Sequence, residues 1–357
     1  MTIQTALEQL KSRSPKFSTL KSALVHRGLP KSNNMINLES KFSNQTLPAA
    51  QIHSQVQTLE RIYKDNVDWG DKAVQFAIFE PADKPLLDAL VAHSYVPQYV
   101  EARGSKFPRQ VDDTEMDGLS INPQLVRCVT NATRTTATLY FYGRGYETSK
   151  EEFAVSGMTD SISQQRFSGY DHVVAYRRTA FQRIDTIFID PANLRIEFRV
   201  DATRLTRIAD ATRTLVILKD VFRSLAQSQV NSVWQRKTFK LANFFPKIEQ
   251  LYNGGDGRLS SLGHNTAAGA TNNGKMRRGL GGDLKADPSH QASLTASLTE
   301  KFSITKAYPY YNGISTVLLS IPGKAADTSS VPPTINTAIV EDCINESQFI
   351  EMMRKLR

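Results

Sequence analysis

The stretch from residue 253 to residue 290 constrains the fold most, because it holds nine of the chain's 19 glycines. Glycine at this density exposes backbone N–H groups and permits positive φ, so such a segment can wrap an anion but packs poorly into a core. Nothing between Asn253 and Ala270 has the apolar spacing of a helix or a strand. We therefore predict a long glycine-rich loop, mobile in the free protein, within an otherwise folded chain.

The rest of the chain predicts an α+β protein. β-Branched and aromatic residues dominate between 138 and 200, so we expect an antiparallel sheet centred on residues 138–200 with helices flanking it. The polar residues 29–50 are typical of an irregular linker. Apolar residues at helical spacing predict helices over 50–63, 205–225, 232–251 and 347–356.

The clearest local structure is a hairpin over 184–200, in which Asp190-Pro191-Ala192-Asn193 joins two apolar strands. Asp at the first turn position accepts a backbone N–H, Pro presets φ, and Asn tolerates the left-handed conformation. Arg195, Glu197 and Arg199 alternate with apolar residues, so they lie on the opposite face of their strand from those neighbours.

The length of 357 residues exceeds that of a typical single domain, and we predict two domains. The first, over 1–135, is mainly helical and acidic in its second half. The second, over 136–357, is a basic α+β domain that contains the 184–200 hairpin and the 253–290 segment.

The net charge of +9 is unevenly distributed along the chain. The net charge is +6 over 1–64, −6 over 65–160, +10 over 161–285 and −1 over 286–357. Excess positive charge confined to particular surfaces attracts phosphate groups. The acidic region 65–160 suits a basic partner, which is either another protein or a second copy of the chain.

Several classes of protein are disfavoured. Cys128 and Cys343 form neither a disulfide framework nor a metal knuckle, which fits a reducing cytoplasm. His264 and His290 flank the glycine-rich segment at a spacing that no metal motif uses. The sequence has no run of eighteen apolar residues, and its first residues lack the basic start and apolar stretch of a signal peptide. We expect a cytoplasmic protein that spans no membrane and uses no metal or cofactor.

The hairpin carboxylates raise one enzymatic alternative. A metal-dependent nuclease needs clustered carboxylates and a basic residue to hold ions against the scissile phosphate. Asp185, Asp190 and Glu197, with Arg199 where a lysine is expected, resemble the core of restriction-type nucleases. The resemblance implies metal-dependent cleavage by these three carboxylates. In the opposing interpretation Glu197 pairs with Arg183 or Arg199 on a solvated face, and Glu197→Gln then affects stability only mildly.

Basic residues interleaved with aromatic residues favour nucleic-acid binding. Lys and Arg neutralise phosphates, and aromatic rings stack on bases. We therefore expect a protein that binds DNA or RNA mainly through phosphates and has no catalytic activity of its own. A structural or regulatory subunit of a multiprotein assembly, using the acidic region 65–160, is the first alternative, and the nuclease is the second. The predicted nucleic-acid contacts are Arg177, Arg178, Arg236, Lys237, Lys275, Arg277 and Arg278.

Overall fold

The structure, a computed structural model, describes residues 2–99, 107–108, 110–205, 207–266, 269–277, 281–295 and 299–357. Within these ranges the chain is an α+β protein with eleven helices and one open antiparallel sheet of eleven strands. The helices are α1 Ile3–Arg13, α2 Phe17–His26, α3 Met35–Ser43, α4 Ala49–Trp69, α5 Lys84–Ala92, α6 Asp113–Met116, α7 Ser161–Arg166, α8 Ile208–Gln229, α9 Phe245–Asn253, α10 Pro288–Thr295 and α11 Glu346–Lys355. The strands are β1 Lys72–Ile78, β2 Gln124–Thr130, β3 Ala137–Ala154, β4 His172–Asp190, β5 Arg195–Asp201, β6 Lys240–Leu241, β7 Arg258–Thr266, β8 Thr271–Lys275, β9 Thr299–Tyr310, β10 Ser315–Ile321 and β11 Ala338–Glu341.

The sheet extends well beyond the region predicted for it. Its order is β2-β3-β4-β5-β1-β11-β10-β9-β7-β8, with β6 pairing β1 off this path. The strands of 138–200 therefore form one half of a sheet that continues through β1 and β11 to β8. The predicted domain boundary at residue 135 falls between β2 and β3, which are hydrogen-bonded neighbours. The division into two domains stays a prediction, and the sheet runs across it.

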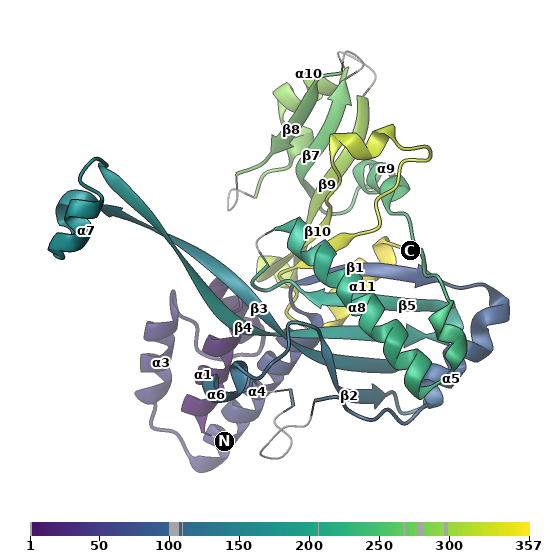
Figure 1. Cartoon of the computed structure of the whole chain (residues 1–357), viewed down its shortest axis with the longest axis horizontal. Helices are drawn as coiled ribbons and strands as arrows, with labels where there is room; N and C mark the ends of the chain where they lie inside the picture. The colour runs from purple at the N-terminus through teal and green to yellow at the C-terminus, as the bar shows by residue number, and fades with distance from the viewer. Residues whose placement is uncertain are drawn as a thin grey trace.

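Three apolar clusters hold helices against the sheet. Helices α5 and α8 lie across one face of the strands from β1 to β5, with Phe198 and Phe222 buried between them (Figure 1). The amino-terminal helices α1 to α4 contribute to a second cluster that includes Tyr142 and Ile184. Helices α9 and α11 pack on the carboxy-terminal half of the sheet, where Phe349 is fully buried. The sheet is thus covered by different helices along its length.

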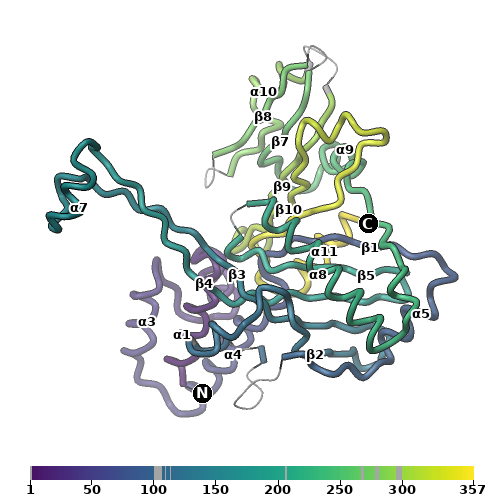
Figure 2. The backbone as a smooth tube through the Cα atoms, in the orientation of Figure 1, coloured from purple at the N-terminus to yellow at the C-terminus, as the bar shows by residue number. Residues whose placement is uncertain are grey.

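Strands β3 and β4 run far past the rest of the sheet. Their register continues from Ala137↔Ile189 near the body to Ala154↔His172 at the far end. The inner halves are buried, whereas residues 147–154 and 172–178 are largely exposed. Figure 2 shows the two backbone segments leaving the body side by side, with α7 at the tip. We call residues 147–179 the arm.

The hairpin turn over 190–194 confirms the predicted turn chemistry. The Asp190 carboxylate accepts the Asn193 N–H at 3.2 Å, and Pro191 opens a short 3-10 turn. The left-handed conformation belongs to Leu194, with φ of 49°, rather than to Asn193 as expected.

The prediction of a glycine-rich loop is wrong, because the segment contains β7 and β8. In a regular strand Leu259 and Leu262 would face opposite sides, since side chains alternate. A β-bulge at Ser260 shifts the register and turns both leucines into the same core. Gly263 lies against Phe302, where a Cβ atom would stand 2.5 Å from the ring. This glycine permits close packing instead of a mobile loop.

Two further element predictions need correction. The helix expected over 232–251 begins only at α9, because Pro246 lacks an N–H and is tolerated only in the first turn of a helix. The upstream residues form a 3-10 turn and the short strand β6. The linker expected over 29–50 contains α3, whose N-cap Asn34 accepts the N–H of Asn37 at 2.8 Å.

Candidate nucleic-acid interface

Glu197, a carboxylate of the nuclease hypothesis, is fully buried within ion pairs. Its Oε2 lies 2.6 Å from Arg199 Nη2, and its Oε1 lies 2.8 Å from Arg195 Nη2. The pairing with Arg199 was expected, but on a solvated face. That expectation is wrong, because the rings of Trp69 and Phe349 lie 5.5 and 4.9 Å from the Arg199 guanidinium and cover it.

Asp185 and Glu197 lie on opposite faces of the sheet. Glu197 is directly opposite Phe188, and Asp185 is three residues from Phe188 along a regularly paired strand. Asp185 binds Arg183 at 2.7 Å, and burial raises the pKa of its carboxyl despite that partner. Asp190 caps the hairpin turn. In the described parts of the chain no three His, Cys, Asp or Glu side chains are grouped to hold a metal ion. This placement does not support the nuclease hypothesis.

Arg177 and Arg178 lie on the arm, away from the body. The Arg178 guanidinium lies 3.9 Å from the centroid of the Tyr146 ring, which holds it by a cation–π contact. The arm also carries acidic residues, and Lys150 Nζ lies 3.8 Å from Glu152 Oε2. The positive charge of these two arginines is therefore mixed with negative charge.

Arg236 and Lys237 follow the 3-10 turn after α8. Lys237 pairs with Asp83 at 2.5 Å, and Arg236 is exposed. Trp234, which begins this basic and aromatic cluster in the sequence, is fully buried, with its ring 6.0 Å from that of Phe222. The tryptophan belongs to the core and is not available to stack on a base.

Lys275 and Arg277 line a groove of about 460 Å³ on the carboxy-terminal half of the sheet. Two further basic residues line the groove: Lys16, from the junction of α1 and α2, and Arg258, from the start of β7. Sequence reasoning missed both, because only the tertiary structure brings such distant segments together. Arg278 lies outside the described residues. We call this site the sheet groove.

Hydroxyl side chains form much of the floor of the sheet groove. Residues of β10 alternate strictly between buried and half-buried, and the half-buried set includes Thr316 and Ser320. On neighbouring strands Thr305, Ser260 and Ser261 line the same groove, and the Thr305 and Ser320 hydroxyls are 3.0 Å apart. The other face of these strands is buried in the core and is mainly apolar, although it includes Lys306. The floor is therefore an open sheet face on which hydroxyl groups lie beside Leu318 and Ala307.

The acidic wall of the groove is already neutralised. Lys16 Nζ lies 2.7 Å from Glu341, 3.4 Å from Asp342 and 3.3 Å from Asp71. Burial alone would lower the pKa of Lys16, but these three carboxylates outweigh it and raise the pKa. Lys16 therefore stabilises its own surroundings more than it attracts a ligand.

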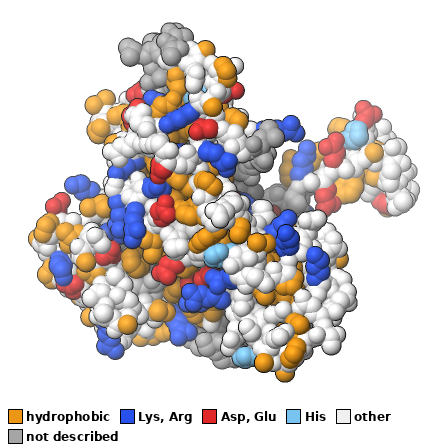
Figure 3. Space-filling view, turned by 180° about the vertical axis from the view of Figure 1, so that it is seen from behind, with side chains coloured by type: hydrophobic (Ala, Val, Ile, Leu, Met, Phe, Trp, Pro, Cys, Tyr) orange, Lys and Arg blue, Asp and Glu red, His pale blue; other side chains and the backbone are white. Residues whose placement is uncertain are grey.

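The basic wall of the groove is not neutralised in the same way. Lys275 and Arg277 are exposed, and neither has an ion-pair partner among the residues that the structure describes. Arg258 donates to the carbonyl of Gly281 at 2.7 Å and has no carboxylate partner among the described residues. In Figure 3, which shows one face of the molecule, Lys and Arg side chains are interspersed with Asp and Glu. In the sheet groove, Lys275, Arg277 and Arg258 lie beside hydroxyl groups and have no carboxylate partner among the described residues.

Comparison with known proteins does not place the chain in a family. No protein-family model matches it, and a search of curated proteins finds no match either. No helix within the described ranges has the length and apolar character needed to cross a membrane. The fold and the sheet groove therefore define the class only as an α+β protein with an open antiparallel sheet and a cationic, hydroxyl-lined face.

Proposed function

We propose that the protein binds nucleic acid through phosphates seated in the sheet groove. The observation that supports this most is that Lys275 and Arg277 are exposed and without ion-pair partners among the described residues, beside Arg258. Lys and Arg neutralise phosphates, and Ser and Thr hydroxyls donate hydrogen bonds to phosphate oxygens. The groove offers both kinds of group on one surface.

The lining of the groove favours a duplex over a single strand. Binding of single strands relies on aromatic side chains on which bases stack. The groove lining holds no aromatic residue among those described. Contacts there would reach only the sugar–phosphate backbone, so we infer little sequence preference.

The test is fluorescence anisotropy with a short duplex and its separate strand, measured over a range of salt concentrations. We expect the duplex to bind more tightly, with a log–log salt slope of about −2 to −3 from the groove cations. Lys275→Gln with Arg277→Gln should bring the slope closer to zero by about 2. Arg213→Gln, an exposed arginine on α8 outside the predicted contacts, is the control and should leave the slope unchanged. A slope near zero in the parent protein would refute the proposal.

A second candidate function, a subunit of a protein assembly, is favoured by the arm. A two-stranded ribbon alone is marginally stable in water. This arm also exposes apolar side chains: Ile162 is 75% exposed, Tyr170 67% and Tyr176 70%. Exposed apolar groups gathered on one projection mark a protein contact. The arm carries the last part of the acidic region 65–160 together with basic residues such as Lys150 and Arg177, so we infer that its exposed apolar groups dock on a second copy of the chain.

The register of the arm allows a clean deletion. Thr148 and Arg178 are direct cross-strand partners, so a two-residue Asn-Gly turn can replace residues 149–177. Light scattering of the full chain should show a dimer or larger species, and the shortened chain should be a monomer with the same thermal stability. A monomeric full chain at high concentration would exclude self-association through the arm.

A further inference from the structure

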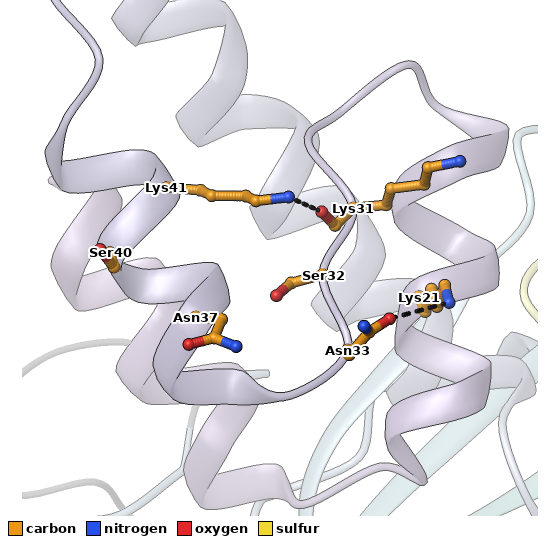
Figure 4. A pocket seen from close by; sticks show the side chains of 7 residues that line it. All are labelled: Lys21, Lys31, Ser32, Asn33, Asn37, Ser40 and Lys41. Atoms are coloured by element: carbon orange, nitrogen blue, oxygen red, sulfur yellow. Dashed lines mark hydrogen bonds between the residues drawn. The ribbon is translucent and has the colours of Figure 1, made fainter.

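The helices α2 and α3 and the loop between them border a second pocket, which is open to solvent and has a volume of about 400 Å³. We call it the lysine pocket. Its lining consists of Lys21, Lys31, Ser32, Asn33, Asn37, Ser40 and Lys41. Figure 4 shows Lys21 reaching the loop from α2 and Lys41 reaching it from α3. Two helices and their connection therefore contribute to one site, which is separate from the sheet groove.

The charge of the lysine pocket is uncompensated. Three of its lining residues are lysines and none is acidic. Lys41 donates to the carbonyl of Lys31 at 2.7 Å, and Lys21 donates to Asn33 Oδ1 at 3.5 Å. Neither acceptor carries a charge. Among the described residues none of the three ammonium groups has a carboxylate partner. Positive charges without carboxylate partners around one pocket favour an anion there.

Ser32 gives a second and independent sign of a ligand. Its side chain lines the pocket, the residue is only 7% exposed, and its hydroxyl has no hydrogen-bond partner in the described part of the chain. In Figure 4 this hydroxyl points from the loop toward α3, into the space between Asn37 and Lys41. This hydroxyl opens into the pocket, where an anionic oxygen would accept its hydrogen in a charge-assisted hydrogen bond.

The rest of the lining narrows the class of ligand. A cavity of about 400 Å³ lies within the range of small-molecule sites and exceeds the need of a single inorganic anion. Asn33, Asn37 and Ser40 offer amide and hydroxyl groups that suit sugar hydroxyls. No aromatic residue lines the pocket, so a base would find no ring on which to stack.

We propose that the lysine pocket binds a small phosphorylated, polyhydroxylated molecule of the sugar-phosphate class. The Lys41 ammonium group and the Ser32 hydroxyl, which lie on the α3 side of the loop, bind the phosphoryl group. Lys21 and Lys31 add positive charge from the other side of the loop. Asn33 and Asn37 hold the hydroxyl groups. This inference is independent of nucleic-acid binding in the sheet groove, because the two sites share no residue.

Titration calorimetry on the full chain tests the proposal, with ribose 5-phosphate as the probe and neutral ribose as its control. Ribose 5-phosphate should bind with one site per chain, and ribose should not bind. Lys31→Gln with Lys41→Gln should weaken the affinity at least tenfold, and Ser32→Ala should weaken it roughly tenfold through the lost charged hydrogen bond. Lys240→Gln, an exposed lysine on β6, should change nothing.

Three outcomes would overturn the proposal. One is no binding of ribose 5-phosphate. Another is binding that the pocket variants leave unchanged, which would place the anion elsewhere. The third is binding of a 5′-phosphorylated oligonucleotide that the pocket variants abolish while ribose 5-phosphate binds no better than ribose. Loss of duplex binding in the Lys275 and Arg277 variant bears only on the sheet groove, so the two proposals fail separately.

Discussion

Arg13 on α1 and Asp201 at the end of β5 form a buried ion pair that joins the amino-terminal helices to the middle of the sheet. Arg13 Nη2 donates to Asp201 Oδ1 at 3.0 Å, and both residues are at least 98% buried. Burial would raise the pKa of Asp201, but Arg13 and Lys72 outweigh it and hold the pKa well below its ordinary value. The carboxylate is therefore charged and needs its cations.

Arg13→Ala should destabilise the protein by about 3–5 kcal/mol, because it leaves a buried carboxylate without its main partner. Chemical denaturation measures this free energy of unfolding. Lys11→Ala on the exposed face of the same helix is the control, since Lys11 is 62% exposed and its pair with half-buried Glu39 should contribute less than about 1 kcal/mol. Equal losses of free energy of unfolding in the two variants would show that the buried pair contributes no more to stability than the pair of Lys11 with Glu39.

Glu197→Gln should destabilise the protein by about 3 kcal/mol or more, since it leaves the Arg195 and Arg199 guanidiniums buried around a neutral amide. This replaces the mild effect predicted for a solvated carboxylate. Glu152→Gln on the arm, where the side chain is 55% exposed, should cost less than about 1 kcal/mol. Urea denaturation of both variants decides whether Glu197 is a structural residue.

Gly263→Ala should destabilise the protein by about 1–3 kcal/mol, because a Cβ atom there overlaps the Phe302 ring and the Ser303 hydroxyl. Gly157→Ala is the matched control, since no atom lies within 4 Å of the added Cβ. Its effect should stay within about 0.5 kcal/mol. Hydrogen exchange should also show slow exchange at the amides of β7 that pair with β9. Fast exchange at these amides, together with an unchanged stability of the Gly263→Ala variant, would instead support the prediction of a mobile loop.

The stability of the β7, β8 and α10 region should fall as the pH drops below about 6.5. His264 and His290 are buried with ring centroids 6.3 Å apart. Burial lowers the pKa of both histidines. The nearby positive groups of His290 and Lys301 lower the pKa of His264 further. Asp287 and Asp283 raise the pKa of His290, but less than burial lowers it. The folded state then binds fewer protons than the unfolded chain, so acid favours unfolding.

Hydrogen exchange of this region, measured from neutral to mildly acidic pH, gives the test. The double variant His264→Gln with His290→Gln should lose most of the added exchange in acid. His53→Gln on the exposed face of α4 should behave like the parent protein. The interpretation fails if the double variant keeps the full pH dependence.

The sequence by itself determined the features that depend on neighbouring residues. The Asp190 turn follows from side-chain chemistry within four positions, and the alternation of Arg195, Glu197 and Arg199 with apolar residues follows from the two-residue repeat of a strand. The α+β class follows from the same local periods. These signals act over a few residues, so they survive in any tertiary context.

The tertiary structure decided which polar residues are buried and which charges are free. The bulge at Ser260, which turns Leu259 and Leu262 to one side, forms in the pairing with β9, and no local period predicts it. Glu197 is a core residue because the rings of Trp69 and Phe349 cover its partner Arg199. The sheet groove likewise needs α1, β7 and β8 to meet. Burial and charge compensation are set by partners distant in the sequence, so local pattern could identify Lys275 and Arg277 as basic residues but could not place them beside Arg258 on an open sheet.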